Sequence, residues 1–271
     1  MNLDLRDLAM HRSIANLIAA FDRTDFWTLL IRVLRTYVHC ESWVALMFSS
    51  NAKPKVFDEN PSDDGAPDPL FQDYLNGLYL FDPFFVASRE HSQSGLFLLD
   101  EVAPDNFILT DYYRLYFKLN VVVDEIQFNV SIDADRTLCF SMGRGSKYSA
   151  EDVAFLHVLA PTIIALMRKR YDHEAGKDGA ILLADSSASP VYEMEDAFSR
   201  IGGRRLTGRE AEIGHLMLAG FSSKNIAEKL KISVETVRAH RRHIYSKLQI
   251  SSQSELFASF YAAQADGKAA H

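Results

Sequence analysis

Polar side chains able to contact nucleic acid gather on one face of a predicted helix spanning about residues 233–248. The buried face of this helix is an apolar stripe formed by Val237, Ile244 and Leu248. The opposite face carries five polar residues: Glu235, Thr236, Arg238, Arg241 and Arg242. Arginine can pair with the acceptor edge of guanine in the major groove, so this face has the chemistry of a base-reading surface. A solvated basic face on a protein-binding helical bundle would look similar, and this alternative stays open here.

Three further helices are predicted to position this one. Thr207 followed three residues later by Glu210 is a capping box, and it opens a helix that Gly220 is placed to end. Serines suited to N-capping precede the other helices: Ser222 or Ser223, Ser233, and Ser251 or Ser252. A tight turn between the second and third helices would place the third in a DNA groove.

The charge distribution agrees with this interpretation. The whole chain has a formal net charge of -7, but residues 204–261 hold ten Lys and Arg against five Asp and Glu. Residues 1–203 hold eighteen basic and thirty acidic side chains. A basic module on an acidic body is typical of nucleic-acid binding, because the acidic body lowers nonspecific affinity for phosphate.

Residues 204–261 resemble the helix-turn-helix domain of the LuxR/FixJ family, also called the GerE-type domain. Caps, glycine, apolar positions and basic positions all follow the family pattern, from Leu206-Thr207-Gly208-Arg209-Glu210 to Lys247-Leu248. The resemblance implies double-stranded DNA as a partner, with the third helix in the major groove and the second against the backbone. It implies base or groove contacts for Glu235, Thr236, Arg238 and Arg242. It implies phosphate contacts for Ser222, Ser223, Lys224, Asn225, His240, Arg241 and Lys247.

The N-terminal region alternates predicted helices and strands. Strands are expected at 42–50, 53–59, 122–132 and 136–142, with helices at 3–21, 24–39, 70–78, 83–90, 110–119 and 149–171. This order predicts an α+β protein whose N-terminal α-β-α sandwich, built on an antiparallel sheet, resembles GAF, PAS and LuxR autoinducer-binding domains. The C-terminal part is predicted to be an all-α four-helix domain.

A ligand site is predicted in this sandwich. Tyr74, Tyr79 and Asp82-Pro83 resemble the autoinducer-binding pattern, in which an aspartate accepts from the ligand amide. The tryptophan that precedes the tyrosine in that pattern is replaced by Leu70 and Phe71, so a lactone carbonyl would lose its donor. Trp43 is a further candidate ligand residue.

Asp124 is predicted to point inward with the apolar residues of the strand 122–132. An unpaired buried carboxylate is costly, so we expect Asp124, with Asp82, to meet a polar or amine-bearing ligand. The expected site is ringed by five tyrosines: Tyr74, Tyr79, Tyr112, Tyr113 and Tyr116. The alternative is that Asp124 caps a loop or pairs with an arginine such as Arg114. An acyl-homoserine lactone receptor, and a ligand-independent regulator acting through protein contacts, remain alternative functions.

Three segments are therefore expected: a sensing and dimerisation domain (1–171), a partly structured linker (172–203) and a DNA-binding domain (204–263). Apolar residues beyond the needs of one sheet face make the helix 149–171 a candidate dimer helix. A homodimer also suits the DNA module, since two copies match a palindromic site.

Other classes of protein are disfavoured by the sequence. No metal spacing, nucleophile elbow or phosphate loop is recognisable, so neither an enzyme nor a cofactor is expected. The pattern of a phosphorylated receiver domain is incomplete. The sequence shows neither a signal peptide nor a membrane-spanning run, and Cys40 and Cys139 read as reduced thiols, so a cytoplasmic protein without membrane contact is expected.

Overall fold

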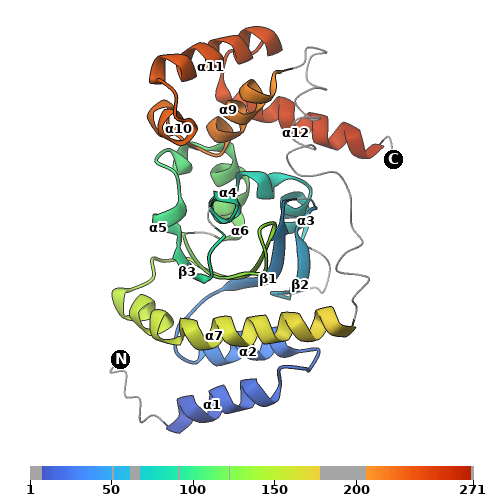
Figure 1. The fold of residues 1–271 in the computed structure, drawn as a ribbon, viewed down its shortest axis with the longest axis vertical. Coiled ribbons are helices and arrows are strands. Elements are labelled where there is room, and N and C mark those ends of the chain that lie inside the picture. The colour runs from blue at the N-terminus through green and yellow to red at the C-terminus, as the bar shows by residue number, and fades with distance from the viewer. Residues whose placement is uncertain are drawn as a thin grey trace.

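The computed structural model describes residues 8–50, 52–61, 68–90, 92–121, 123–177 and 206–269. These residues form a sheet-containing N-terminal domain and a helical C-terminal domain (Figure 1). Most of the linker expected at 172–203, whose partial structure was predicted as a small hairpin within 180–192 and a short helix near 193–201, lies outside the described residues.

The N-terminal domain is built on five antiparallel strands in the order β2-β1-β5-β4-β3. Their bounds are β1 (Ser42–Ser49), β2 (Lys55–Glu59), β3 (Gly95–Leu98), β4 (Asp124–Ser131) and β5 (Arg136–Arg144). The four predicted strands are present, and the short edge strand β3 is an addition to them. Strands β1, β5 and β4 lie in the centre, where both faces of the sheet are covered, which explains why they are buried along nearly their whole length.

Two helices cover one face of the sheet, α2 (Phe26–Arg35) and α7 (Ala150–Lys177), and α1 (Leu8–Ala19) packs against α2 on the outer side of this layer (Figure 1). Trp27 of α2 stacks on Phe140 of β5 with ring centroids 6.0 Å apart. Helix α7 is long and apolar enough to be a candidate membrane span, but Leu156 and Met167 are buried in the core against this face of the sheet. It behaves as a core helix, and it continues past the domain boundary predicted at residue 171.

Shorter elements cover the opposite face. They are α3 (Pro69–Leu75), α4 (Pro83–Glu90), α5 (Leu99–Val102) and α6 (Lys118–Asn120), the 3₁₀ turns η1 (Leu78–Phe81) and η2 (Phe107–Leu109), and the single π-helical turn η3 (Tyr113–Phe117). Asp68 caps α3 through a 2.9 Å hydrogen bond from the Leu70 amide, which fixes the start of this layer.

The C-terminal domain contains α9 (Gly208–Leu218), α10 (Ser223–Leu230), α11 (Val234–Leu248) and α12 (Gln253–Ala269). The predicted capping box is present, because Thr207 accepts from the Glu210 amide and Glu210 accepts from the Thr207 amide. Ser222 and Ser233 cap α10 and α11 as predicted. The expected α-β-α sandwich followed by a four-helix domain is confirmed.

The helical domain sits on the layer of short elements, away from α1, α2 and α7 (Figure 1). The Phe81 ring of η1 packs against Phe257 and Phe260 of α12, with centroids 5.6 and 5.2 Å away. Beside it, the His215 Nε2 atom of α9 is 2.7 Å from the Leu80 carbonyl oxygen, an acceptor. The Asn106 amide donates to the Gly220 carbonyl at 3.0 Å, so the turn before α10 is also held.

Candidate DNA-binding surface and ligand cavity

The four residues predicted to read bases all lie on the solvent-exposed face of α11. Glu235, Thr236, Arg238 and Arg242 are exposed, whereas Val237 and Ile244 on the other face are fully buried. Within the described residues, neither Arg238 nor Arg242 makes an ion pair or hydrogen bond with the protein. Their guanidinium groups are therefore available to an external acceptor.

The predicted phosphate contacts at the start of α10 are partly engaged by the protein itself. The Ser222 hydroxyl accepts from the Asn225 amide at 3.2 Å, and the Ser222 amide donates to the Asp105 carboxylate at 3.0 Å. Ser223 accepts from Arg241 Nη1 at 3.3 Å, which joins α10 to α11. Lys224 remains largely exposed, with its nearest carboxylate, that of Glu228, 4.0 Å away.

Two other predicted phosphate contacts face the interior of the helical domain. Lys247 Nζ lies 2.6 Å from Glu210 Oε2, forming an ion pair whose carboxylate is almost fully buried. This pairing lowers the pKa of Glu210, although burial by itself would raise it. His240 is half-buried, and its Nδ1 atom is buried. Lys247 therefore has a structural partner, and His240 is turned toward α9 rather than outward.

Replacing Arg238 with alanine should weaken binding to the specific operator by about 10- to 100-fold, since an arginine–guanine pair contributes about 1–3 kcal/mol. The operator would first be selected from random DNA, and affinities would be measured by fluorescence anisotropy. Lys224→Ala is the matched control: it should weaken specific and random DNA alike and reduce the salt dependence by about one charge. Equal losses on both DNAs for Arg238→Ala would contradict a base-reading role.

A cavity of about 610 Å³ lies on the face of the sheet opposite α2 and α7, between β1, β4 and β5 and the layer of short elements. Of the predicted ligand residues, Trp43, Tyr74 and Asp82 line it. Tyr112 and Tyr116, which belong to the predicted ring of tyrosines, also line it. The Tyr74 and Tyr116 rings stack with their centroids 5.0 Å apart, forming one aromatic wall.

Asp82 is held rigidly at the inner end of this wall. Its two oxygens accept from the Tyr74 hydroxyl at 2.7 Å and from the Phe84 amide at 2.8 Å. Burial raises the pKa of Asp82 to about 6, although these hydrogen bonds favour the ionised form. Burial, and after it the Asp82 carboxylate, raise the pKa of Tyr74 well above its ordinary value, so Tyr74 is a neutral donor.

A second buried carboxylate, Glu125 of β4, also lines the cavity. Burial and the nearby charge of Asp82 raise the pKa of Glu125 well above its ordinary value. Glu59 and Asp68 complete a set of four carboxylates among the lining residues, and those residues include no Lys, Arg or His. The carboxylates of the lining thus favour a positively charged group in the cavity.

Two predicted ligand residues lie outside the cavity lining. Asp124 accepts from the Tyr148 amide at 2.9 Å and lies 3.5 Å from Lys147 Nζ, so it caps the loop after β5. The prediction that Asp124 faces the ligand is wrong in position, because the residue begins its strand and turns toward that loop. Tyr79 is fully buried, and its ring packs edge-on against Tyr74 and Phe85. Tyr79 therefore packs against the side of Tyr74 that faces away from the cavity.

Comparison with known proteins agrees with both halves of this description. Residues 204–260 match the model of the bacterial regulatory proteins, luxR family. The chain is 29% identical over 184 residues to an HTH-type transcriptional regulator in the exeN 3′ region of Aeromonas salmonicida, covering 65% of this chain and 91% of that protein. This chain is a LuxR-family transcriptional regulator. Members of this family are DNA-binding regulators, so the expectation that the chain is not an enzyme is confirmed.

This LuxR-family regulator is also similar to a second curated protein and to one solved structure. It is 51% identical over 71 residues to the oxygen regulatory protein NreC of Staphylococcus epidermidis, covering 26% of this chain and only 30% of NreC. The crystal structure of the VqsR LBD domain from Pseudomonas aeruginosa is 40% identical, with a TM-score of 0.57, covering 61% of this chain and 98% of that one. The similarity to the VqsR LBD domain thus covers 61% of this chain, whereas the similarity to NreC is limited to 71 residues.

Proposed function

We propose that this LuxR-family regulator is controlled by an amine-bearing small molecule bound in the cavity of its N-terminal domain. The supporting observation is the cavity lining, which has four carboxylates and no basic side chain. An ammonium group between Asp82 and Glu125 would neutralise buried charge that the free protein carries at a cost. Tyr74 and Tyr116 offer aromatic rings, which attract the same cation, whereas the Trp43 ring packs on Phe140 in the core on the other face of the sheet.

For the proposed regulator we keep the division expected from the sequence, although α7 extends to Lys177. Residues 1–171 would sense the ligand, residues 172–203 would connect, and residues 204–263 would bind double-stranded DNA in the cytoplasm. Asp82, which lines the cavity, directly follows Phe81, which contacts α12, and Leu80, which contacts α9. Ligand occupancy at Asp82 would therefore change the docking of the helical domain through two adjacent residues.

A homodimer remains part of the proposal on the ground of operator symmetry. Most apolar residues of α7 are buried or half-buried within one chain, and Val158 is 49% exposed. α7 therefore offers less apolar surface to a partner than its sequence suggests. Sedimentation of the protein with and without a palindromic DNA would test the two-to-one complex.

Titration calorimetry tests the ligand class, with putrescine and tyramine as amines and N-octanoyl-homoserine lactone as the competing probe. We expect saturable binding of an amine, lost in the Glu125→Gln variant. Asp124→Asn is the matched control, since both carboxylates lie at the start of β4 but only Glu125 lines the cavity. Saturable lactone binding that Glu125→Gln leaves unchanged would overturn the amine proposal in favour of a lactone receptor.

A further inference from the structure

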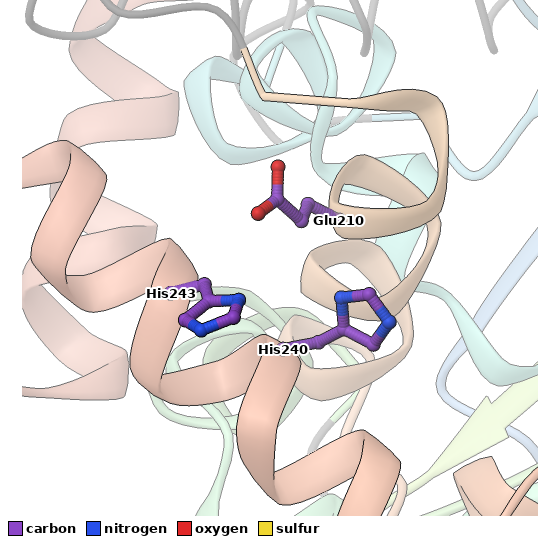
Figure 2. A group of neighbouring side chains, drawn as sticks. All are labelled: Glu210, His240 and His243. Atoms are coloured by element: carbon purple, nitrogen blue, oxygen red, sulfur yellow. The ribbon is translucent and has the colours of Figure 1, made fainter.

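Two histidines and a glutamate converge between α9 and α11, on the flank of α11 that lies between its base-reading face and its buried face. Glu210 comes from α9, and His240 and His243 are one turn apart on α11. Their side chains point toward a common space (Figure 2), and one ligand atom of each lies within 4.8 Å of the others. These residues come from two helices, so their meeting is a product of the domain fold and not of one helix.

Some of the oxygen and nitrogen atoms in this cluster that could bind a metal make no described hydrogen bond. Among the described contacts, Glu210 Oε2 accepts from the Thr207 amide, the Thr207 hydroxyl and Lys247 Nζ, at 2.8, 2.9 and 2.6 Å. No described contact uses Glu210 Oε1. His240 Nδ1 is buried and has no hydrogen-bond partner within the described residues, an arrangement that is costly for a polar atom. His243 is exposed, so its imidazole is free to turn.

Two imidazoles and one carboxylate are a ligand set that Zn²⁺ and neighbouring divalent transition metals prefer. Ligand atoms about 2 Å from a tetrahedral ion lie roughly 3–3.5 Å apart, slightly closer than the present limit of separation. Rotation of the exposed His243 side chain can close that difference without moving either helix. Lys247 bonds only Oε2, so Glu210 Oε1 can bind an ion while the existing ion pair stays in place.

We propose that Glu210, His240 and His243 form a divalent transition-metal site, with Zn²⁺ the best match, that ties the base-reading helix α11 to α9. The fourth position would be left to solvent, because the described cluster supplies three donors. The site is independent of the ligand cavity, and it assigns the half-buried His240 to a metal in place of a DNA phosphate. Bound metal would stabilise the helical domain, since it joins two helices only in the folded state.

The test uses the full-length protein and Co²⁺, whose visible absorption reports a low-symmetry protein site. We expect one Co²⁺ per chain, displacement by Zn²⁺, and a Zn²⁺-induced rise in Tm of a few degrees. His243→Asn should weaken binding at least about 10-fold and abolish the Tm rise. This position is exposed, so the variant should fold normally, whereas Glu210 also caps α9 and is a less informative target.

His157→Asn is the matched control, because His157 is an exposed histidine of α7 remote from this cluster. This control should bind Co²⁺ as the wild type does. Failure of the wild type to bind Co²⁺ with visible absorption would overturn the proposal, as would equal affinity in the His243→Asn and His157→Asn variants. Neither result would bear on the amine cavity, which is tested by separate probes.

Discussion

The Phe81→Ala variant is expected to unfold with a free energy about 3–5 kcal/mol lower than the wild type. Phe81 is only 1% exposed, and its ring contacts His215, Phe257 and Phe260 of the helical domain. Truncation would remove these contacts and leave a cavity at the junction of the two domains. Because Phe81 is the aromatic centre of this junction, we also expect unfolding to separate into two transitions.

Chemical denaturation followed by circular dichroism and by tryptophan fluorescence would measure this effect. Both tryptophans, Trp27 and Trp43, are in the N-terminal domain, so fluorescence reports that domain alone. Leu115→Ala is the control, since Leu115 is 53% exposed and its truncation should cost less than about 0.5 kcal/mol. A single transition at wild-type stability for Phe81→Ala would show that the domains are not energetically joined at η1.

The second large effect concerns Asp82 and pH. In the free protein the pKa of Asp82 is raised by burial to about 6 from 3.8 in the unfolded chain. The folded state thus favours the neutral form of Asp82. The contribution of this group to the free energy of unfolding is complete below pH 3.8 and is lost as the pH rises through 6. The shift corresponds to roughly 3 kcal/mol. Asp82→Asn cannot ionise, so its stability relative to the wild type should grow by that order between about pH 4 and pH 8.

Comparing wild type with variant is necessary because other groups titrate in the same interval. Burial lowers the pKa of His215, so that histidine contributes stability that is lost as the pH falls, opposite in sign to Asp82. The difference between the two proteins cancels this contribution. Urea unfolding at several pH values gives the result, and a difference that does not change with pH would contradict the raised pKa of Asp82.

The same carboxylate should respond oppositely when ligand is present. An ammonium ligand binds the ionised form, so amine affinity should rise as the pH passes upward through about 6 in the wild type. The pH at which the free protein becomes less stable is therefore the pH at which it becomes competent to bind. Calorimetric titration at pH values below and above this point would check the expected rise.

The helical domain could be predicted closely because its signals are local. Thr207 with Glu210, Ser222 and Ser233 each cap a helix within three residues of their own position, so spacing alone identifies them. The tertiary engagement of Lys247 with Glu210 was not predictable, since it joins residues on two different helices. Spacing therefore predicts the helices and the exposed face of α11, but not which basic residues are already paired.

The ligand cavity shows where sequence patterns are insufficient. Alternation on β4 separates Glu125 from Ile126 correctly, but it does not tell which face borders a cavity when both faces are buried. The ligand was therefore predicted on the apolar face of the strand, with Asp124, whereas the cavity lies on the face of Glu125. The available signal for the cavity face was the row of a glutamate, a glutamine and an asparagine at alternate positions of β4. Strand β3 was missed because a strand of four residues gives too short a pattern to recognise.

One face of β4 packs the core of the domain, and the other face lines the ligand cavity. Ile126, Phe128 and Val130 belong to the core beneath α2 and α7, while Glu125 faces the cavity from the same strand. Substitutions on the cavity face can then alter which molecule is sensed without disturbing the packing on which the domain depends. We expect this scaffold to accept a wide repertoire of effectors among relatives, and to be a practical starting point for engineering sensors with new inputs.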